Sequence, residues 1–246
     1  MGGTETRYVT DPALLNELQA YRKQNEDLMN KYAELVQKIQ DQDIDSFEDL
    51  EKYDAKAAES LIKLAQGTVP IKMEGRNFGF FGATSTGKST MINKLLNKNV
   101  AATGAGETTK EITKYDCADY FLYDVPGKND DISYFSMQYI SFWKGLTGRL
   151  VLIRSTLKEM TKVFRLLDAI GLHYDVVVNR FDEVAMEERD AFKQQINNEV
   201  TECKLKGVDH IWFLSARNPP QFPDWIEMVD YLTKASSLTL TIDLKQ

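Results

Sequence analysis

The sequence predicts an α/β fold in which a mostly parallel sheet carries helices on both faces and is preceded by an N-terminal α-helical hairpin. Three observations lead to this prediction. From residue 150 onward, short apolar runs typical of buried strands alternate with amphipathic helical patterns, which favours a parallel sheet. At residues 77–93 an aromatic run, a glycine-bounded loop and a helical pattern follow one another directly. Residues 11–66 carry two helical patterns separated by a polar break, which indicates the hairpin.

The composition of the 246-residue chain allows one large domain, or one domain with an appendage. Apolar residues make up 43% of it, which is enough for a substantial core. The net charge of −7 argues against nucleic-acid binding driven by bulk charge, so we expect no nucleic-acid partner. Cys117 and Cys203 lie far apart without a C-x-x-C motif, which is typical of reduced thiols in a cytoplasmic protein. The sequence shows no signal peptide and no apolar run of about 18 residues, so no transmembrane helix is predicted.

Residues 1–10 are predicted to form a disordered lead-in. Within them, Met1–Thr6 fits M-G-x-x-x-[ST], the pattern for N-myristoylation of Gly2. A myristoylated chain would contact membranes peripherally. The alternatives are a chance match and a cloning remnant, either of which would leave the protein cytoplasmic.

The hairpin is predicted over residues 11–68. Asp11 and Pro12 begin its first helix as N-cap and first-turn residue. Apolar side chains then recur at alternating spacings of four and three residues, which is the seam of a heptad pattern. The seam consists of Leu14, Leu18, Tyr21, Leu28, Tyr32, Leu35 and Ile39. Asn25 occupies the missing step, and such an Asn can set register and partner number. Two interpretations remain: the helix packs on its own domain, or it joins two chains as a homodimer.

The second helix of the hairpin is predicted as one continuous segment. Ser46 caps it, Gly67 ends it, and Pro70 confirms the stop. Its apolar face consists of Phe47, Leu50, Tyr53, Ala57, Leu61 and Leu64. The α/β domain is then expected to occupy residues 69–246.

Residues 82–89 fit the pattern G-x-x-x-x-G-K-[ST] between a strand at 78–81 and a helix, which is the context that this motif requires. Glycines let the backbone fold tightly around an anion with its N–H groups pointing inward, and the following helix adds the positive end of its dipole. Lys88 is expected to reach the β- and γ-phosphates of a nucleotide, and the Ser89 hydroxyl to bind Mg²⁺. The predicted nucleotide-binding residues of this stretch are Gly82, Ala83, Thr84, Ser85, Thr86, Gly87, Lys88, Ser89 and Thr90.

The segments after this loop complete the predicted sheet. Residues 98–111 are rich in Gly, Ala and Thr and are expected to be mobile. Strands at 111–118 and 120–125 are joined by a tight turn, and a helix covers 134–145. The elements beyond are strands at 150–154, 175–179 and 210–214 and helices at 158–170, 186–206 and 224–234.

Short polar motifs fall in the mobile loop and at the carboxyl ends of the strands, where parallel sheets bind ligands. In order they are the phosphate loop, a Thr-bearing stretch at Glu107–Lys110, D-x-x-G at Asp124–Gly127, N-x-x-D at Asn179–Asp182 and S-A-x at Ser215–Arg217. With these motifs, residues 70–235 resemble the translation-factor-related GTPases. Within that group the chain looks most like the immunity-related and dynamin-like GTPases, because of the helices before the domain, the Glu-Thr-Thr-Lys stretch and the Pro of Asp-Val-Pro-Gly.

This resemblance implies a three-layer P-loop GTPase domain that binds GTP and GDP with Mg²⁺ and hydrolyses GTP to GDP and phosphate. The implied metal ligands are Ser89, Thr109 and Asp124, with Thr108 as the alternative to Thr109. The Gly127 N–H is expected to meet the γ-phosphate. The implied catalytic residues are Lys88, Thr109, Thr84 and Ser85.

Asp182 indicates guanine rather than adenine, because its carboxylate can accept from both N1–H and the exocyclic amine of guanine. A base without these donors would leave the carboxylate unpaired, at a cost of roughly 1–3 kcal/mol. Asn179 is expected to brace the loop and touch the base, and the stem of Arg180 to lie along the ring. Ala216 is expected to offer its N–H to guanine O6. The implied base-binding residues are Asn179, Arg180, Asp182, Ser215, Ala216 and Arg217.

The chain departs from the GTPase pattern at residues that affect nucleotide binding and the rate of GTP hydrolysis. Arg180 replaces the usual Lys, keeping the charge but not the geometry. Lys128 follows the D-x-x-G motif near where Ras-like enzymes carry a catalytic Gln, so Thr84 and Ser85 are left to help place water. We therefore expect slow intrinsic hydrolysis, raised by a homodimer paired through its G domains. The alternative is a non-hydrolysing, nucleotide-gated interaction module.

Overall fold

The computed structural model describes residues 26–41, 47–101, 112–117, 120–126 and 137–234, together with positions 16, 19, 20 and 23. Several predictions fall outside these residues and stay predictions. They concern the lead-in, Gly2, the start of the first helix, Thr108, Thr109, Gly127 and Lys128.

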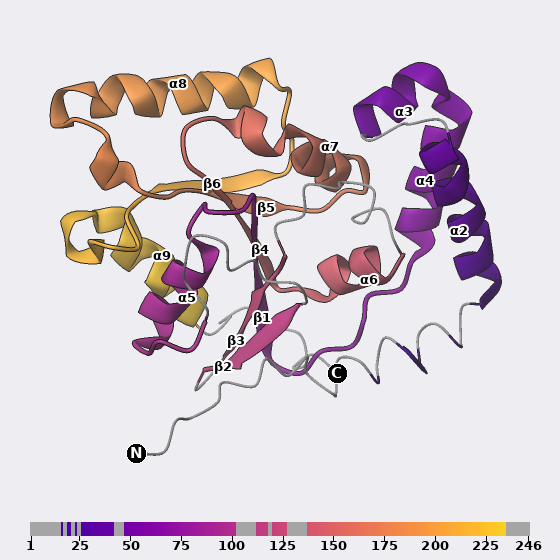
Figure 1. The fold of residues 1–246 in the computed structure, drawn as a ribbon, viewed down its shortest axis with the longest axis horizontal. Helices are drawn as coiled ribbons and strands as arrows, with labels where there is room; N and C mark the ends of the chain where they lie inside the picture. The colour runs from indigo at the N-terminus through magenta and orange to yellow at the C-terminus, as the bar shows by residue number, and fades with distance from the viewer. Residues whose placement is uncertain are drawn as a thin grey trace, which may run out of the picture.

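The described part of the chain contains a six-stranded sheet in the order β2-β3-β1-β4-β5-β6 (Figure 1). Its strands are β1 (Arg76–Gly82), β2 (Thr113–Asp116), β3 (Tyr120–Asp124), β4 (Gly148–Ile153), β5 (Tyr174–Val178) and β6 (Val208–Phe213). Only the β2–β3 pair is antiparallel among the pairs of this sheet, and the other four pairs are parallel. The predicted mostly parallel sheet is confirmed.

Helices cover both faces of the sheet. The longer ones of this domain are α5 (Lys88–Leu96), α6 (Met137–Gly145), α7 (Thr161–Ala169), α8 (Arg189–Glu202) and α9 (Pro223–Thr233). Short 3₁₀ turns are η2 (Leu157–Met160), η3 (Phe181–Glu183), η4 (Met186–Glu188) and η5 (Pro219–Gln221). Figure 1 shows α5 and α9 on one side of the sheet and α6 and α7 on the other. Among the helices described, none is long and apolar enough to cross a membrane.

The register of the parallel strands brings their carboxyl ends to one edge of the sheet. Phe80 of β1 pairs with Asp124 of β3, and Gly82 pairs with Leu152 of β4. Every residue of β4 and β5 is buried, as expected for central parallel strands covered on both faces. The loops that follow β1, β3, β5 and β6 therefore all leave the sheet at this same edge.

Three helices precede the sheet: α2 (Glu26–Asp41), α3 (Phe47–Tyr53) and α4 (Ala55–Gly67). The prediction of one continuous second helix is wrong, because the chain breaks at Asp54. The Asp54 carboxylate accepts from the Ala57 N–H at 2.9 Å and caps α4 as a separate helix. This break changes the helical phase, so that Tyr53, predicted on the apolar face, is 78% exposed while Leu50 and Leu61 are buried.

The C-terminus of α4 is held by a lysine of α6. Lys144 Nζ donates to the carbonyl oxygens of Ala65 at 3.1 Å, Gln66 at 2.9 Å and Thr68 at 2.6 Å. Carbonyls in the last turn of a helix have no partner within the helix, and a cation there also interacts favourably with the helix dipole. Lys144 therefore fastens α4 to the α/β domain.

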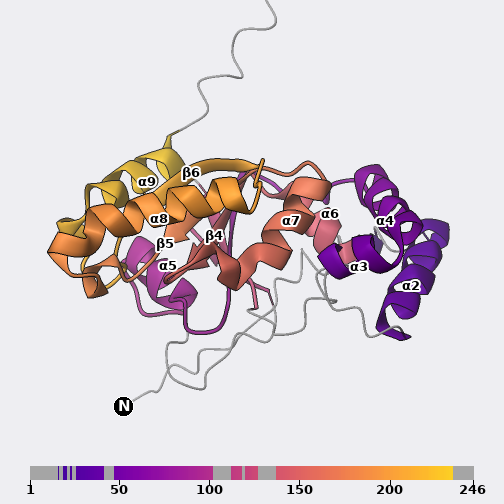
Figure 2. The same ribbon diagram turned by 90° about the horizontal axis from the view of Figure 1, so that it is seen from above.

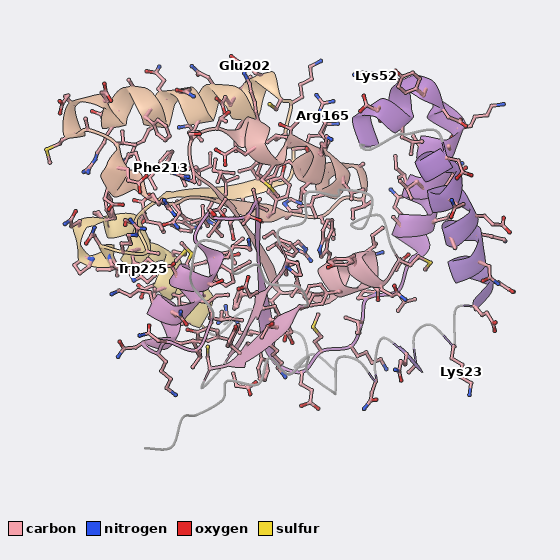
Figure 3. All side chains as sticks on the ribbon, viewed as in Figure 1. Lys23, Lys52, Arg165, Glu202, Phe213 and Trp225 are labelled. Carbon is pink, nitrogen blue, oxygen red and sulfur yellow. The ribbon has the colours of Figure 1, made fainter. Side chains whose placement is uncertain are left out.

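The segment after α4 continues along α6. The Ser141 hydroxyl donates to the Val69 carbonyl at 2.9 Å, and the Ile71 N–H donates to the Ser141 carbonyl at 3.1 Å. A Cβ on Gly145 would lie 2.6 Å from the Ile71 carbonyl oxygen, so only glycine permits this approach. Further along, α3 contacts α7, and Figure 3 labels Lys52 and Arg165 on these two helices. Figure 2 confirms that α3 and α4 lie beside α6 and α7.

The second part of the predicted hairpin, α3 and α4, thus packs on the α/β domain. Buried residues of these helices join the same apolar core as the sheet: Leu50, Ala58, Leu61 and Ala65. Helix α2 packs mainly against α4. Self-association through the first helix stays a prediction.

We predict that Lys144→Met lowers the free energy of unfolding by about 1–3 kcal/mol, because it removes a charged donor from three helix-end carbonyls. Urea denaturation measures the change. Lys63→Met on α4 is the matched control, because Lys63 is exposed and pairs on the surface with Glu59; its effect should stay within about 0.5 kcal/mol. Equal effects of the two substitutions would contradict the proposed role of Lys144.

Candidate nucleotide-binding site

The loop between β1 and α5 has the backbone that an anion-binding loop needs. Ser85 and Gly87 take left-handed conformations, with φ of 68° and 95°. A Cβ on Gly87 would lie 2.4 Å from Nδ2 of Asn179, and one on Gly82 would lie 2.5 Å from the Leu152 carbonyl oxygen. The two glycines of the motif are therefore required for two reasons: neighbouring atoms leave no room for a Cβ, and their backbone has a positive φ. Helix α5 begins directly after the loop, so its N-terminus adjoins the loop.

Lys88, the first residue of α5, folds back over this loop. Its Nζ donates to the carbonyl oxygens of Gly82 at 2.9 Å and Ala83 at 3.3 Å, and the residue is 7% exposed. Burial lowers the pKa of Lys88, and the negative charge of Asp124 opposes that shift. The ammonium group therefore lies at the loop, beside a carboxylate that favours its charged form.

Ser89 and Asp124 bring two oxygen ligands together. The Ser89 hydroxyl donates to Oδ2 of Asp124 at 2.8 Å, and Asp124 ends β3 with 1% exposure. Hydroxyl and carboxylate oxygens are the ligand types that Mg²⁺ prefers. Among the residues described, no group of three or more His, Cys, Asp or Glu side chains lies close enough to hold a metal ion. The oxygen pair at the phosphate loop is thus where the chain fits the implied Mg²⁺.

Asn179, at the end of β5, joins two loops. Its Nδ2 donates to the Thr86 carbonyl oxygen at 2.8 Å, and its Oδ1 accepts from the Ala216 N–H at 3.0 Å. The residue is 2% exposed, so both bonds form inside the protein. The Ala216 N–H, which the sequence assigns to guanine O6, is therefore donated to Asn179 in this structure.

Arg180 and Asp182 follow on the same loop. Arg180 takes a left-handed backbone, and its Nη2 donates to the Ser85 carbonyl oxygen at 3.2 Å, so it reaches the phosphate loop. Asp182 Oδ2 accepts from Nδ2 of Asn218 at 2.9 Å. Its Oδ1 is buried and accepts no hydrogen bond from the described residues. Burial raises the pKa of Asp182, but the Ser215 hydroxyl, the Asn218 amide and the charge of Arg217 lower it, and the net shift is downward.

The Ser215–Arg217 segment closes the site from β6. The buried Ser215 hydroxyl oxygen accepts from the backbone N–H groups of Arg217 and Asn218, both at 3.2 Å. The Arg217 side chain is exposed and lies 3.9 Å from a Glu183 carboxylate oxygen. A cavity of about 520 Å³ adjoins this segment, and Thr90 of α5 also lines it.

Two residues of the site were missed by the sequence analysis. Asn218 contacts Asp182, and Glu183 lies within 3.4 Å of the guanidinium groups of Arg154 and Arg180. A usable signal was present for Asn218 alone: it follows Ser-Ala-Arg and precedes two prolines that fix the turn. Glu183 is one charged residue in a mixed run and carries no such signal.

Comparisons with known proteins bear on the identity of this site. A family model described as 50S ribosome-binding GTPase matches residues 77–236. The probable GTP-binding protein EngB of Mycoplasma genitalium is 26% identical over 147 residues, covering 54% of this chain and 73% of that protein. The probable EngB of a Wolbachia species from Brugia malayi is 32% identical over 140 residues, covering 49% of this chain and 71% of that protein.

Solved structures are also similar. The translation elongation factor SelB of Methanococcus maripaludis, in complex with the GTP analogue GppNHp, matches with a TM-score of 0.45 and 18% identity. That match covers 65% of this chain and 33% of the SelB chain. The structure of a probable EngB matches with a TM-score of 0.42 and 16% identity over 62% of this chain and 97% of that chain.

The family model and the curated relatives support a P-loop GTPase domain, but they do not support the narrow resemblance. The immunity-related and dynamin-like assignment finds no support, and EngB proteins are indicated instead. The family model spans well over half of the chain, and it covers the phosphate loop and the segments that the sequence assigns to the base. The chain belongs to the 50S ribosome-binding GTPase family and is a GTP-binding P-loop GTPase.

Proposed function

We propose that this protein is a Mg²⁺-dependent GTP switch with slow intrinsic hydrolysis. The observation that carries the proposal is the hydrogen-bonded assembly of the phosphate loop with the loops after β3, β5 and β6. Ser89 bonds to Asp124, and Asn179 bonds to both Thr86 and Ala216. Four separate segments thereby face one edge of the sheet, each with the chemical groups that one part of a guanine nucleotide requires.

The phosphate chain is bound by the loop and by Lys88. Backbone N–H groups of a glycine-bounded loop and of a helix N-terminus attract anions. Lys88 Nζ already lies at the loop, donating to Gly82 and Ala83 carbonyls, and exchanges these acceptors for phosphate oxygens of higher charge density. Its charge then stabilises negative charge that develops as water attacks the γ-phosphorus and the bond to the β-phosphate oxygen breaks.

The oxygens of Ser89 and Asp124 would hold the metal. Mg²⁺, when bound, supplies positive charge at the β- and γ-phosphate oxygens. Asp124 is buried, and its charge interacts with that of Lys88. Thr109, with Thr108 as the alternative, is proposed as the further ligand from the loop at Glu107–Lys110.

The base is bound by the loops after β5 and β6. Asp182 has one buried carboxylate oxygen without a donor among the described residues, which suits the N1–H and exocyclic amine of guanine. Adenine presents no such pair of donors. Arg180, held against the Ser85 carbonyl, extends beside the phosphate loop, where its planar group can lie along the ring.

The slow rate follows from the lack of a Gln after Asp-Val-Pro-Gly, where the sequence has Lys128. Thr84 and Ser85 are exposed on the phosphate loop and are proposed to help place the attacking water. We propose that a second copy, paired through the G domains, supplies the remaining groups.

We predict that Lys88→Ala weakens GTP and GDP binding by about 100-fold or more, because a charge-assisted contact to phosphate is lost. Isothermal titration calorimetry in Mg²⁺ buffer measures it. Lys63→Ala, an exposed change on α4, is the control and should bind as the wild type does. Wild-type affinity in the Lys88 variant would show that the loop does not bind the phosphates.

Asp182→Asn is expected to shift preference from guanine to xanthine nucleotides. The amide donates where the carboxylate accepted, and xanthine offers a carbonyl oxygen in place of the exocyclic amine. The affinity for GDP should fall by roughly 10–100-fold while that for xanthosine diphosphate rises, measured by competition binding. Wild-type protein that binds ADP as tightly as GDP would contradict the assignment of the base site.

Phosphate release measured across protein concentrations tests hydrolysis and pairing together. We expect a low rate per molecule that increases with concentration, because pairing completes the site. A constant low rate would contradict activation by pairing. If a sample that binds GTP releases no phosphate at any protein concentration, the non-hydrolysing interaction module is favoured.

A further inference from the structure

We propose that Asn218 is a positioning residue that orients the Asp182 carboxylate and thereby sets selectivity for the 2-amino group of guanine. This inference rests on the proposed function of the same site. Asn218 lies just beyond the S-A-x motif, and the motif itself assigns it no role. Its Nδ2 donates to Asp182 Oδ2 at 2.9 Å, across two loops that follow different strands.

The turn that carries Asn218 is rigid. The Asn218 N–H donates to the buried Ser215 hydroxyl at 3.2 Å, and the Asn218 carbonyl accepts from the Gln221 N–H at 3.1 Å. Pro219 and Pro220 begin η5 immediately after it, and each proline fixes its own φ. The residue is partly buried between these contacts. Its amide is therefore held in place by the backbone before it meets Asp182.

The contact fixes the plane of the carboxylate. An ionised carboxylate has two oxygens, each with two lone-pair positions, and the torsion that rotates it is soft. Asn218 takes one position on Oδ2 and leaves the rest of the group available, including the buried Oδ1. Guanine needs both oxygens at once, one for N1–H and one for the 2-amino group. A carboxylate free to rotate presents both oxygens in the required plane only part of the time.

The neighbouring carboxylate behaves differently. Glu183 is exposed and lies within 3.4 Å of Arg154 and Arg180 and 3.9 Å of Arg217. Its negative charge is offset by arginines within salt-bridge distance, whereas the hydrogen bond to Asp182 Oδ2 comes from a neutral amide, alongside the Ser215 hydroxyl and the charge of Arg217. Asn218 thus orients Asp182 without neutralising it, which suits a group that must accept hydrogen bonds from a neutral base.

The test compares GDP with inosine diphosphate, which lacks the 2-amino group. Binding of both is measured by calorimetry for wild type, Asn218→Ala and Asn218→Asp. We expect the wild type to prefer GDP. In each variant the affinity for GDP should fall by about 10-fold, with a smaller loss for inosine diphosphate, so that the ratio of the two affinities drops. Asn218→Asp keeps the shape of the side chain, removes the donor and places a second negative charge beside Asp182, so its loss for GDP should be at least as large; it serves if the alanine variant does not fold.

Asn197→Ala is the matched control, because the Asn197 amide donates to a backbone carbonyl on the exposed side of α8. It should leave both affinities unchanged. A wild-type ratio in the folded Asn218 variants, or equal losses for both nucleotides, would overturn the positioning role, since general damage to the pocket weakens both. Failure of the wild type to bind either nucleotide would instead overturn the proposed function of the site.

Discussion

The buried amide of Asn179 is the interaction on which the arrangement of the site depends. It donates to the phosphate loop at Thr86 and accepts from the loop after β6 at Ala216. A buried amide that lost either partner would leave a polar group unsatisfied, so the loops cannot separate without a free-energy cost. Gly87 is part of the same constraint, since any side chain there would displace the Asn179 amide. The loops proposed to bind the phosphates and the base are therefore held together by contacts within the chain itself.

Much of this arrangement could be predicted from the sequence, and the reason is geometric. Parallel strands end at a common edge, so motifs at strand ends must meet there whatever their distance in sequence. The strand at 76–82, the helix that begins at Lys88 and the position of Asp124 at the end of β3 all agree with the predicted elements. The pattern of apolar residues was sufficient to predict the central strands, because β4 and β5 are buried on both faces and therefore consist of apolar runs.

The remainder depends on tertiary contacts that leave little trace in local sequence. The break at Asp54 separates α3 from α4, and a predicted continuous helix placed Tyr53 on the wrong face. The Lys144 cap and the Asn218 contact each join residues more than thirty positions apart. The narrow family resemblance was also misleading. It relied partly on the helices before the domain, and the curated relatives indicate EngB proteins instead.

The attachment of α4 to α6 has a practical consequence for dividing the protein. A fragment that begins at residue 69 would keep every nucleotide motif. It would, however, lose the helices that pack against α6 and α7, and the Lys144 ammonium would be exposed to solvent. The part of the apolar core that packs with Leu61 and Ala65 would be exposed to water, which favours aggregation of the shortened chain. A stable minimal domain should therefore start upstream of α3.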